Sequence, residues 1–121
     1  MSLELNLKKS ICTRVLVYHD NVHIANVYVN PSDINSMCEE VYMKTQNIDS
    51  AWYHNPLVEC WKDSCRSSSI GDIFVIDGVY YKVSFIHYPK YDKRFTNEFE
   101  MKYVAQSDSS IAKMELGAAH V

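Results

Sequence analysis

A short polar stretch, residues 66–72, carries the groups best suited to holding an anion. It reads Arg66-Ser67-Ser68-Ser69-Ile70-Gly71-Asp72. Consecutive hydroxyl and backbone N–H groups beside an arginine can cradle a phosphate or a carboxylate, although the stretch lacks the lysine and glycine spacing of a P-loop. A serine-rich turn leading into a strand, with Asp72 accepting local backbone hydrogen bonds, explains the same residues. We favour this structural role, and the binding role stays open beside it.

Aromatic residues gather in the segment before this stretch. A stacking platform for a base or an anchor in a protein interface can be formed by Trp52, Tyr53 and Trp61. We favour the alternative that they cover the open side of a small sheet. Because the apolar residues here need cover, we expect Trp52 and residues 66–72 to share one contiguous surface. The residues expected on a ligand- or partner-binding surface are Asn47, Asp49, Trp52, Tyr53, Asn55, Trp61, Arg66, Ser67, Ser69 and Asp72.

The sequence contains no motif for nucleophilic catalysis. A hydrolase needs a nucleophile, a base and an orienting group within reach of one another. Ser68, His54 and Asp49 can be named for these roles, but no nucleophile-elbow pattern supports them. His19 and His23 flank a predicted turn and, without a third ligand, are interpreted as surface residues. We therefore predict no catalytic residue.

The four cysteines are predicted to be free thiols, because no secretory signal is evident and a reducing compartment is then expected. Cys12 and Cys38 occupy apolar-periodic positions and are predicted to be small core residues. Cys60 and Cys65 lie near each other in a loop, but no second Cys/His pair at zinc spacing accompanies them. The prediction is no metal site and no cofactor.

The first half of the chain predicts a hairpin followed by a helix. Residues 11–19 and 22–29 are rich in β-branched and aromatic side chains, and Asp20-Asn21 between them tolerates positive φ. Asn30 can cap a helix whose first residue is Pro31. Its apolar stripe includes Ile34, Met37, Cys38 and Val41, and the helix is expected to reach about Gln46.

The second half predicts a long loop and three antiparallel strands. Residues 47–69 show no clear period, and a loop of that length is often functional. Residues 73–76, 79–87 and 98–105 are expected to be strands, the first two joined by Asp77-Gly78. The predicted fold class is α+β, with a small antiparallel sheet of two hairpins plus a last strand packed on one main helix. One domain, residues 1–106, and a weakly ordered tail, residues 107–121, are expected.

Composition narrows the functional classes. A chain of 121 residues with 47% apolar residues suits a single domain that has a real core. The formal net charge of -3 argues against a dedicated DNA-backbone binder. No apolar run approaches a membrane span, and residues 1–9 are not followed by the apolar region of a signal peptide. These features predict a cytoplasmic protein without membrane attachment.

The region from residue 35 to residue 88 resembles a group of small uncharacterised proteins carried by bacteriophages and plasmids. The resemblance is carried by residues 47–52 (NIDSAW), Asn55-Pro56, the 66–72 stretch and Asp77-Gly78. It also resembles, more loosely, the YodL-like domain. The chain departs from the group at Tyr53, where a second tryptophan is common, and at His87-Tyr88, where a Gly-aromatic pair is frequent.

The resemblance implies a mobile-element origin and an accessory role inside a bacterial cell. The expected function is non-catalytic binding of a host macromolecule, a host protein above all, with inhibition of a host enzyme or defence system as one result. The alternative is a nucleotide or nucleic-acid binding module. It would place Arg66, Ser67 and Ser69 on phosphate and a loop tryptophan on a base. A homodimer is compatible with either function.

Overall fold

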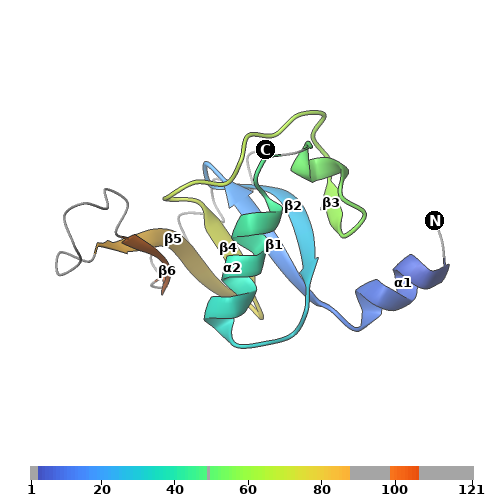
Figure 1. Cartoon of the computed structure of the whole chain (residues 1–121), viewed down its shortest axis with the longest axis horizontal. Coiled ribbons are helices and arrows are strands. Elements are labelled where there is room, and N and C mark those ends of the chain that lie inside the picture. Colours follow the sequence, from blue (N-terminus) through green and yellow to red (C-terminus); the bar gives the residue numbers. More distant parts are fainter. Residues whose placement is uncertain (1–2, 49, 88–98, 107–121) are drawn as a thin grey trace.

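The computed structural model describes residues 3–48, 50–87 and 99–106. In these residues the chain forms one open antiparallel sheet of six strands together with two α-helices, so the predicted α+β class is confirmed (Figure 1). In chain order, the elements are α1 (Leu3–Ser10), β1 (Thr13–His19), β2 (Val22–Val29), α2 (Ile34–Lys44), the 3-10 turn η1 (Trp52–His54), β3 (Val58–Cys60), β4 (Ile73–Ile76), β5 (Val79–His87) and β6 (Phe99–Ala105).

The sheet order is β3-β2-β1-β4-β5-β6, so β1 and β4 pair at its centre. Their pairing places Leu16 opposite Val75 and Val17 opposite Phe74. The predicted turns are confirmed: Asp20 and Asn21 have φ of 54° and 64°, and Asp77 and Gly78 have φ of 49° and 79°. The two predicted hairpins therefore belong to one sheet.

The strands bury side chains on alternating faces. Phe74 and Ile76 belong to the main cluster of buried residues, whereas Ile73 and Val75 belong to a smaller cluster with Tyr18 and Tyr80. A strand covered on both faces is apolar at every position, which explains the unbroken apolar run of β4. The main cluster also contains Met37, Cys38 and Val41 of α2. Tyr103 of β6 donates a hydrogen bond to Glu39 of α2 at 2.7 Å, and α2 crosses the sheet in the view of Figure 1.

The helix α2 begins later and ends earlier than the sequence predicted. Asp33, not Asn30, is its N-terminal cap, and the Asp33 carboxylate accepts hydrogen bonds from the Ser36 N–H at 2.9 Å and the Ser36 hydroxyl at 2.8 Å. Pro31 therefore lies before the helix. The helix ends at Lys44 because Thr45 caps it, and the buried Thr45 hydroxyl donates to the Val41 carbonyl at 2.9 Å.

Two further expectations about local structure were wrong. Residues 47–69 are not free of secondary structure, because η1 and β3 lie within them. Asn55 supports this region: its side chain accepts from the Leu57 N–H and its carbonyl accepts from the Val58 N–H. Strand β3 has three residues, too few for alternation to be recognised in the sequence. The predicted core residue Cys12 is only half-buried, whereas Cys38 is fully buried as expected.

The helix α1 was not predicted, and it contains no buried residue. In Figure 1 it extends away from the sheet. The predicted tail at residues 107–121 lies outside the described residues. Within the part of the chain that the structure describes, no helix combines the length and the apolar content needed to cross a membrane.

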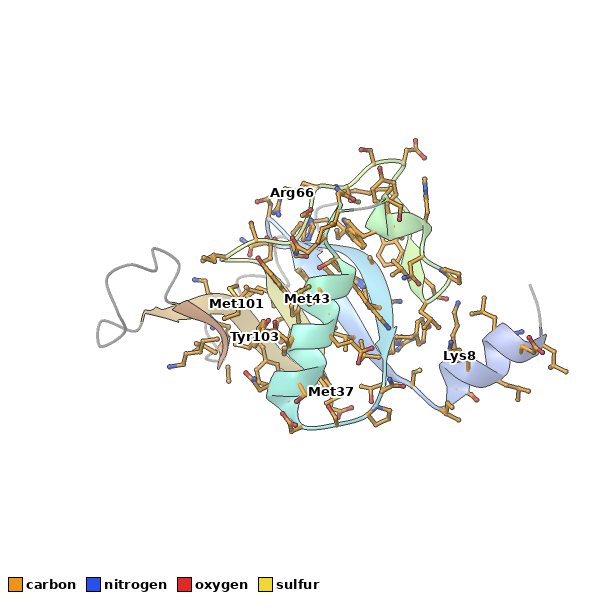
Figure 2. All side chains as sticks on the ribbon, viewed as in Figure 1. Lys8, Met37, Met43, Arg66, Met101 and Tyr103 are labelled. Carbon is orange, nitrogen blue, oxygen red and sulfur yellow. The ribbon has the colours of Figure 1, made fainter. Side chains whose placement is uncertain are left out.

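The two methionines of α2 test the assignment of its inner face (Figure 2). Met37 is 6% exposed and Met43 is 56% exposed. Met37→Ala is expected to lower the free energy of unfolding by about 2–5 kcal/mol, because it removes buried atoms and leaves a cavity. Met43→Ala, the same chemical change, is expected to shift it by no more than about 0.5 kcal/mol. Urea denaturation measures both values, and equal losses would contradict the assignment of Met37 to the core.

Candidate functional site

The 66–72 stretch folds around its own carboxylate. The guanidinium of Arg66 donates to both oxygens of Asp72, at 2.7 Å and 2.8 Å, and the Ser69 N–H donates to the same carboxylate at 2.8 Å. The side chain of Asp72 is 5% exposed and that of Arg66 is 42% exposed. The predicted acceptance of local backbone hydrogen bonds by Asp72 is therefore confirmed. The arginine, serine and backbone groups do form an anion cradle, and Asp72 occupies it.

A buried histidine completes this cluster. His19, the last residue of β1, has its Nε2 atom 2.8 Å from the Ser68 hydroxyl and 3.7 Å from the Asp72 carboxylate. His19 and Ser68 are 6% and 3% exposed. The interpretation of His19 as a surface residue was wrong, because residues 66–72 cover the end of β1. Burial lowers the pKa of His19, and the nearby Asp72 opposes this shift more weakly. The imidazole is therefore held in its neutral form.

The contacts of Ser68 do not match a hydrolytic triad. In such a triad the two nitrogens of the histidine are divided between the nucleophile and the acid. Here the same Nε2 atom of His19 faces both Ser68 and Asp72, and Ser68 is sealed from solvent. His54, the histidine first considered as a base, is exposed on η1, and Asp49 lies outside the described residues. The arrangement is suited to holding the fold, and it presents no accessible nucleophile.

A second set of hydrogen bonds ties this cluster to the end of α2. Asn47 donates from its side chain to the Cys65 carbonyl at 2.9 Å and accepts from the Trp52 N–H at 3.1 Å. The Asn47 N–H donates to the Ser67 hydroxyl at 2.7 Å. The indole N–H of Trp52 donates to the Arg66 carbonyl at 2.9 Å. Trp52 therefore contacts the 66–72 stretch as the predicted shared surface requires, but the contact is buried and Trp52 adds almost nothing to an exposed surface.

A stacking platform, the less favoured of the two alternatives for these aromatic residues, does not form around Trp52. Its ring is 3% exposed, too little for a base to stack on it. Tyr53 is half-buried, with its ring edge-on to Trp52 at 5.9 Å between centroids. Trp61 is 56% exposed, and it contacts the ring of His23 edge-on at 4.7 Å. Of the three aromatic candidates, Trp61 alone presents a largely open ring.

Eight of the ten predicted binding residues fall into two groups, while Tyr53 packs against Trp52 and Asp49 lies outside the described residues. The first group is a scaffold of residues that are joined to one another by hydrogen bonds: Asn47, Trp52, Arg66, Ser67 and Asp72. Ser69 belongs to the same cluster through its contacts with Asp72 and Arg66. Asn55 and Trp61 lie outside it: the first holds the turn before β3 and the second follows β3.

Two hollows flank the scaffold. The first, with a volume of about 280 Å³, is lined by His19, Asp20, Lys62 and Arg66 among others. The second, which we call the helix-end groove, has a volume of about 520 Å³ and lies between the end of α2 and residues 46–56. Its lining residues are Met43, Lys44, Gln46, Ile48, Ser50, Ala51, Trp52, His54, Asn55 and Pro56.

Sequence reasoning missed the two most exposed apolar residues of the helix-end groove. Met43 is 56% exposed and Ile48 is 71% exposed. The sequence did carry a signal for Ile48, because it is a large apolar residue between Asn47 and Asp49 in a polar segment, and such a residue is often exposed at a binding site.

The described residues contain no group of three or more His, Cys, Asp or Glu side chains arranged to hold a metal ion. Comparisons with protein-family models, with curated proteins and with solved structures gave no match for this chain.

Removal of Arg66 tests whether the charged cluster holds the fold. Arg66→Ala is expected to lower the free energy of unfolding by about 2 kcal/mol, because Asp72 is left as a buried charge without its partner. The loss stays below that of a fully buried pair because the Arg66 side chain is 42% exposed and is screened by water. Arg66→Lys, which keeps the charge without the planar fork, is expected to show an intermediate loss.

Chemical denaturation of the two variants measures these losses. In the double variant Arg66→Ala/Asp72→Asn, part of the stability is expected to return, because no uncompensated charge remains. An Arg66→Ala protein as stable as the wild type would show that the pair has no structural role.

The lowered pKa of His19 predicts a pH-dependent stability. The unfolded chain takes up a proton near pH 6.5, whereas folded His19 resists protonation until a lower pH. Its contribution is therefore fully present above pH 6.5 and is lost as the pH falls from 6.5 through the folded pKa. The free energy of unfolding should fall there by up to about 1.4 kcal/mol per pH unit. Urea denaturation between pH 7.5 and pH 5 measures this slope, and His19→Gln should reduce it. If the stability of His19→Gln fell with pH as steeply as that of the wild type, His19 would not be the group that causes the pH dependence.

Proposed function

We propose that this chain is a small non-catalytic accessory protein that binds a protein partner through the helix-end groove. The observation that carries the proposal is the exposure of two large apolar side chains, Met43 and Ile48, in the lining of one groove of about 520 Å³. Apolar residues gathered in a hollow are typical of an interaction site. The occupant we expect is a short segment of the partner that presents a large apolar side chain.

The lining of the groove favours an apolar contact over a charged one. Ala51 and Pro56 supply further apolar surface beside Met43 and Ile48, whereas Trp52 lines the groove as a buried residue. Lys44 also lines the groove, but Glu40 pairs with its ammonium group at 2.8 Å and offsets its charge. A partner would therefore bind mainly by burying apolar area, with the polar residues around the groove setting its orientation.

The buried scaffold gives the groove a defined shape before the partner arrives. Asn47 and Trp52 lie on either side of Ile48 in the sequence, and both are held by hydrogen bonds to residues 65–67. The Thr45 carbonyl accepts from the Ser68 N–H at 3.0 Å, which ties the end of α2 to the same segment. A surface that needs little ordering on binding loses less conformational entropy.

The setting that we propose is the cytoplasm of a bacterial host. It is supported by the resemblance of residues 35–88 to proteins carried by bacteriophages and plasmids. The partner is then a host protein, and occupation of its surface by this chain can inhibit a host enzyme or a defence system. This part of the proposal rests on the resemblance, whereas the groove rests on the geometry.

A nucleotide or nucleic-acid binding module remains the second candidate. The observation in its favour is the smaller hollow of about 280 Å³, which is lined by Lys62 and Arg66 and lies in the same region as the exposed Trp61. It is the weaker candidate because the fork of Arg66 already binds Asp72 and the ring of Trp52 is buried. A thermal-shift panel of nucleotides separates the two candidates, since a ligand at a hundred times its Kd adds about 2.7 kcal/mol to stability.

A charge in the groove is expected to remove partner binding. Ile48→Asp places a carboxylate where an apolar contact forms, so its affinity for the partner should fall at least tenfold, or about 1.4 kcal/mol. Ile70→Asp is the matched control, because Ile70 is 54% exposed and does not line the groove. The partner is first captured from bacterial lysate on the wild-type protein and identified by mass spectrometry. The Kd is then measured by calorimetry with the purified partner.

Circular dichroism establishes that both aspartate variants are folded. Loss of affinity in Ile70→Asp but not in Ile48→Asp would place the interface elsewhere and overturn the assignment of the groove.

A further inference from the structure

Two thiols face each other beside the smaller hollow. The Sγ atoms of Cys60 and Cys65 are 3.4 Å apart. Cys60 is the last residue of β3 and is half-buried, whereas Cys65 is 8% exposed and lies in the main cluster of buried residues. Both are free thiols in the structure. In the part of the chain that is described, no other pair of cysteines is in contact.

We infer that Cys60 and Cys65 are a redox-active pair that closes to a reversible intramolecular disulfide. A disulfide bond is about 2.05 Å long, so the two sulfurs need to approach by only about 1.4 Å from their present separation. Nothing in the proposed binding function requires this chemistry, so the inference stands independently of the groove.

The backbone holds both cysteines in the position that closure needs. Cys60 pairs with Ala25 of β2, so the edge of the sheet fixes it. The Cys65 carbonyl accepts the side-chain hydrogen bond of Asn47, and Arg66 is anchored by Asp72. The residues between the two cysteines form a short surface segment, exposed along its length from Trp61 to Ser64. Formation of the disulfide therefore links two residues whose backbones are held in place, and the exposed residues between them can change conformation to allow it.

The oxidant for disulfide formation is a small-molecule disulfide such as oxidised glutathione. The more accessible Cys60 attacks one sulfur of this disulfide, which forms a mixed disulfide and releases one glutathione thiolate. Cys65 then attacks the Cys60 sulfur, which breaks the mixed disulfide and releases the second glutathione. The protein loses two electrons and two protons, and one disulfide becomes two thiols.

The second step is expected to be slow at neutral pH. Burial, followed by the hydrogen bond with Cys60, raises the pKa of Cys65 to about 11. Because the thiolate is the attacking form, little Cys65 is reactive at pH 7, and the rate of closure should rise with pH. Cys12 and Cys38 are controls for this reaction, because in the described residues neither of their sulfur atoms contacts the sulfur of another cysteine.

The closed pair would remodel the smaller hollow. Lys62, Ser64 and Cys65 all line it, and all three lie in or at the end of the segment that the disulfide closes. Trp61 lies in the same segment, and its indole N–H donates to the His23 carbonyl at 3.2 Å. Its fluorescence therefore reports on closure without any knowledge of a partner.

The full-length protein is incubated in glutathione buffers of increasing oxidised fraction, is quenched with acid, and is then alkylated with a maleimide under denaturing conditions so that buried thiols also react. We expect two of the four thiols to become protected, with the loss of two hydrogen atoms from the intact mass. Peptide mapping should join Cys60 to Cys65, and dithiothreitol should reverse the change. Circular dichroism should show the same fold in both states.

The cysteine variants separate this pair from the other thiols. Cys60→Ser and Cys65→Ala are each expected to lose the intramolecular bond, and Cys65→Ala should accumulate the mixed disulfide on Cys60. Cys12→Ser/Cys38→Ala should close as the wild type does. If the wild-type protein kept all four thiols alkylatable, formed only a stable glutathione adduct, or cross-linked to a second chain instead, the inference would be overturned.

Discussion

The charged hydrogen bonds around the Asp72 carboxylate are the constraint on which the rest of the site depends. A carboxylate that is nearly sealed from water is stable only with strong partners. Arg66 and the Ser69 N–H provide them, and they hold residues 66–69 over the start of β4. The Asp72 carbonyl also accepts from the Val83 N–H of β5 at 2.8 Å, so the same residue is anchored to the sheet. His19 packs beneath this arrangement because Ser68 offers it a hydrogen-bond partner.

From this anchor, polar contacts extend to a region that has little regular structure. The end of α2, residue Asn47 and the 3-10 turn at Trp52 are all bound to the 65–68 backbone. These bonds give the helix-end groove a fixed wall and leave Ile48 exposed beside it. The thiol pair lies along the same backbone segment, where Cys65 immediately precedes Arg66. The proposed groove and the proposed redox pair thus adjoin the same backbone segment, which Arg66 anchors to Asp72.

The features that the sequence predicted correctly are those set by neighbouring residues. Asp20-Asn21 and Asp77-Gly78 form turns because few other residue types accept positive φ. Residues 73–76 are a buried strand because every side chain is apolar, and Asp72 accepts from Ser69 because the two are three residues apart. The cap of α2 shows the limit of this reasoning. Asn30 and Asp33 are both good caps, and the path of the chain after β2 decided between them.

The sequence by itself determined the two tight turns, the strands other than β3, the α+β class and the set of groups at residues 66–72 that can cradle an anion. Only the tertiary structure decided that Asp72 fills this cradle, that His19 is buried and that Trp52 is covered while Ile48 is exposed. The physical reason is that these outcomes depend on contacts between distant segments. Pairing of β1 with β4 brings His19 to Ser68, and the bonds of Asn47 bring α2 to Cys65. A local sequence pattern indicates which side chains are available for such contacts, and the packing of the whole chain determines which of them come into contact.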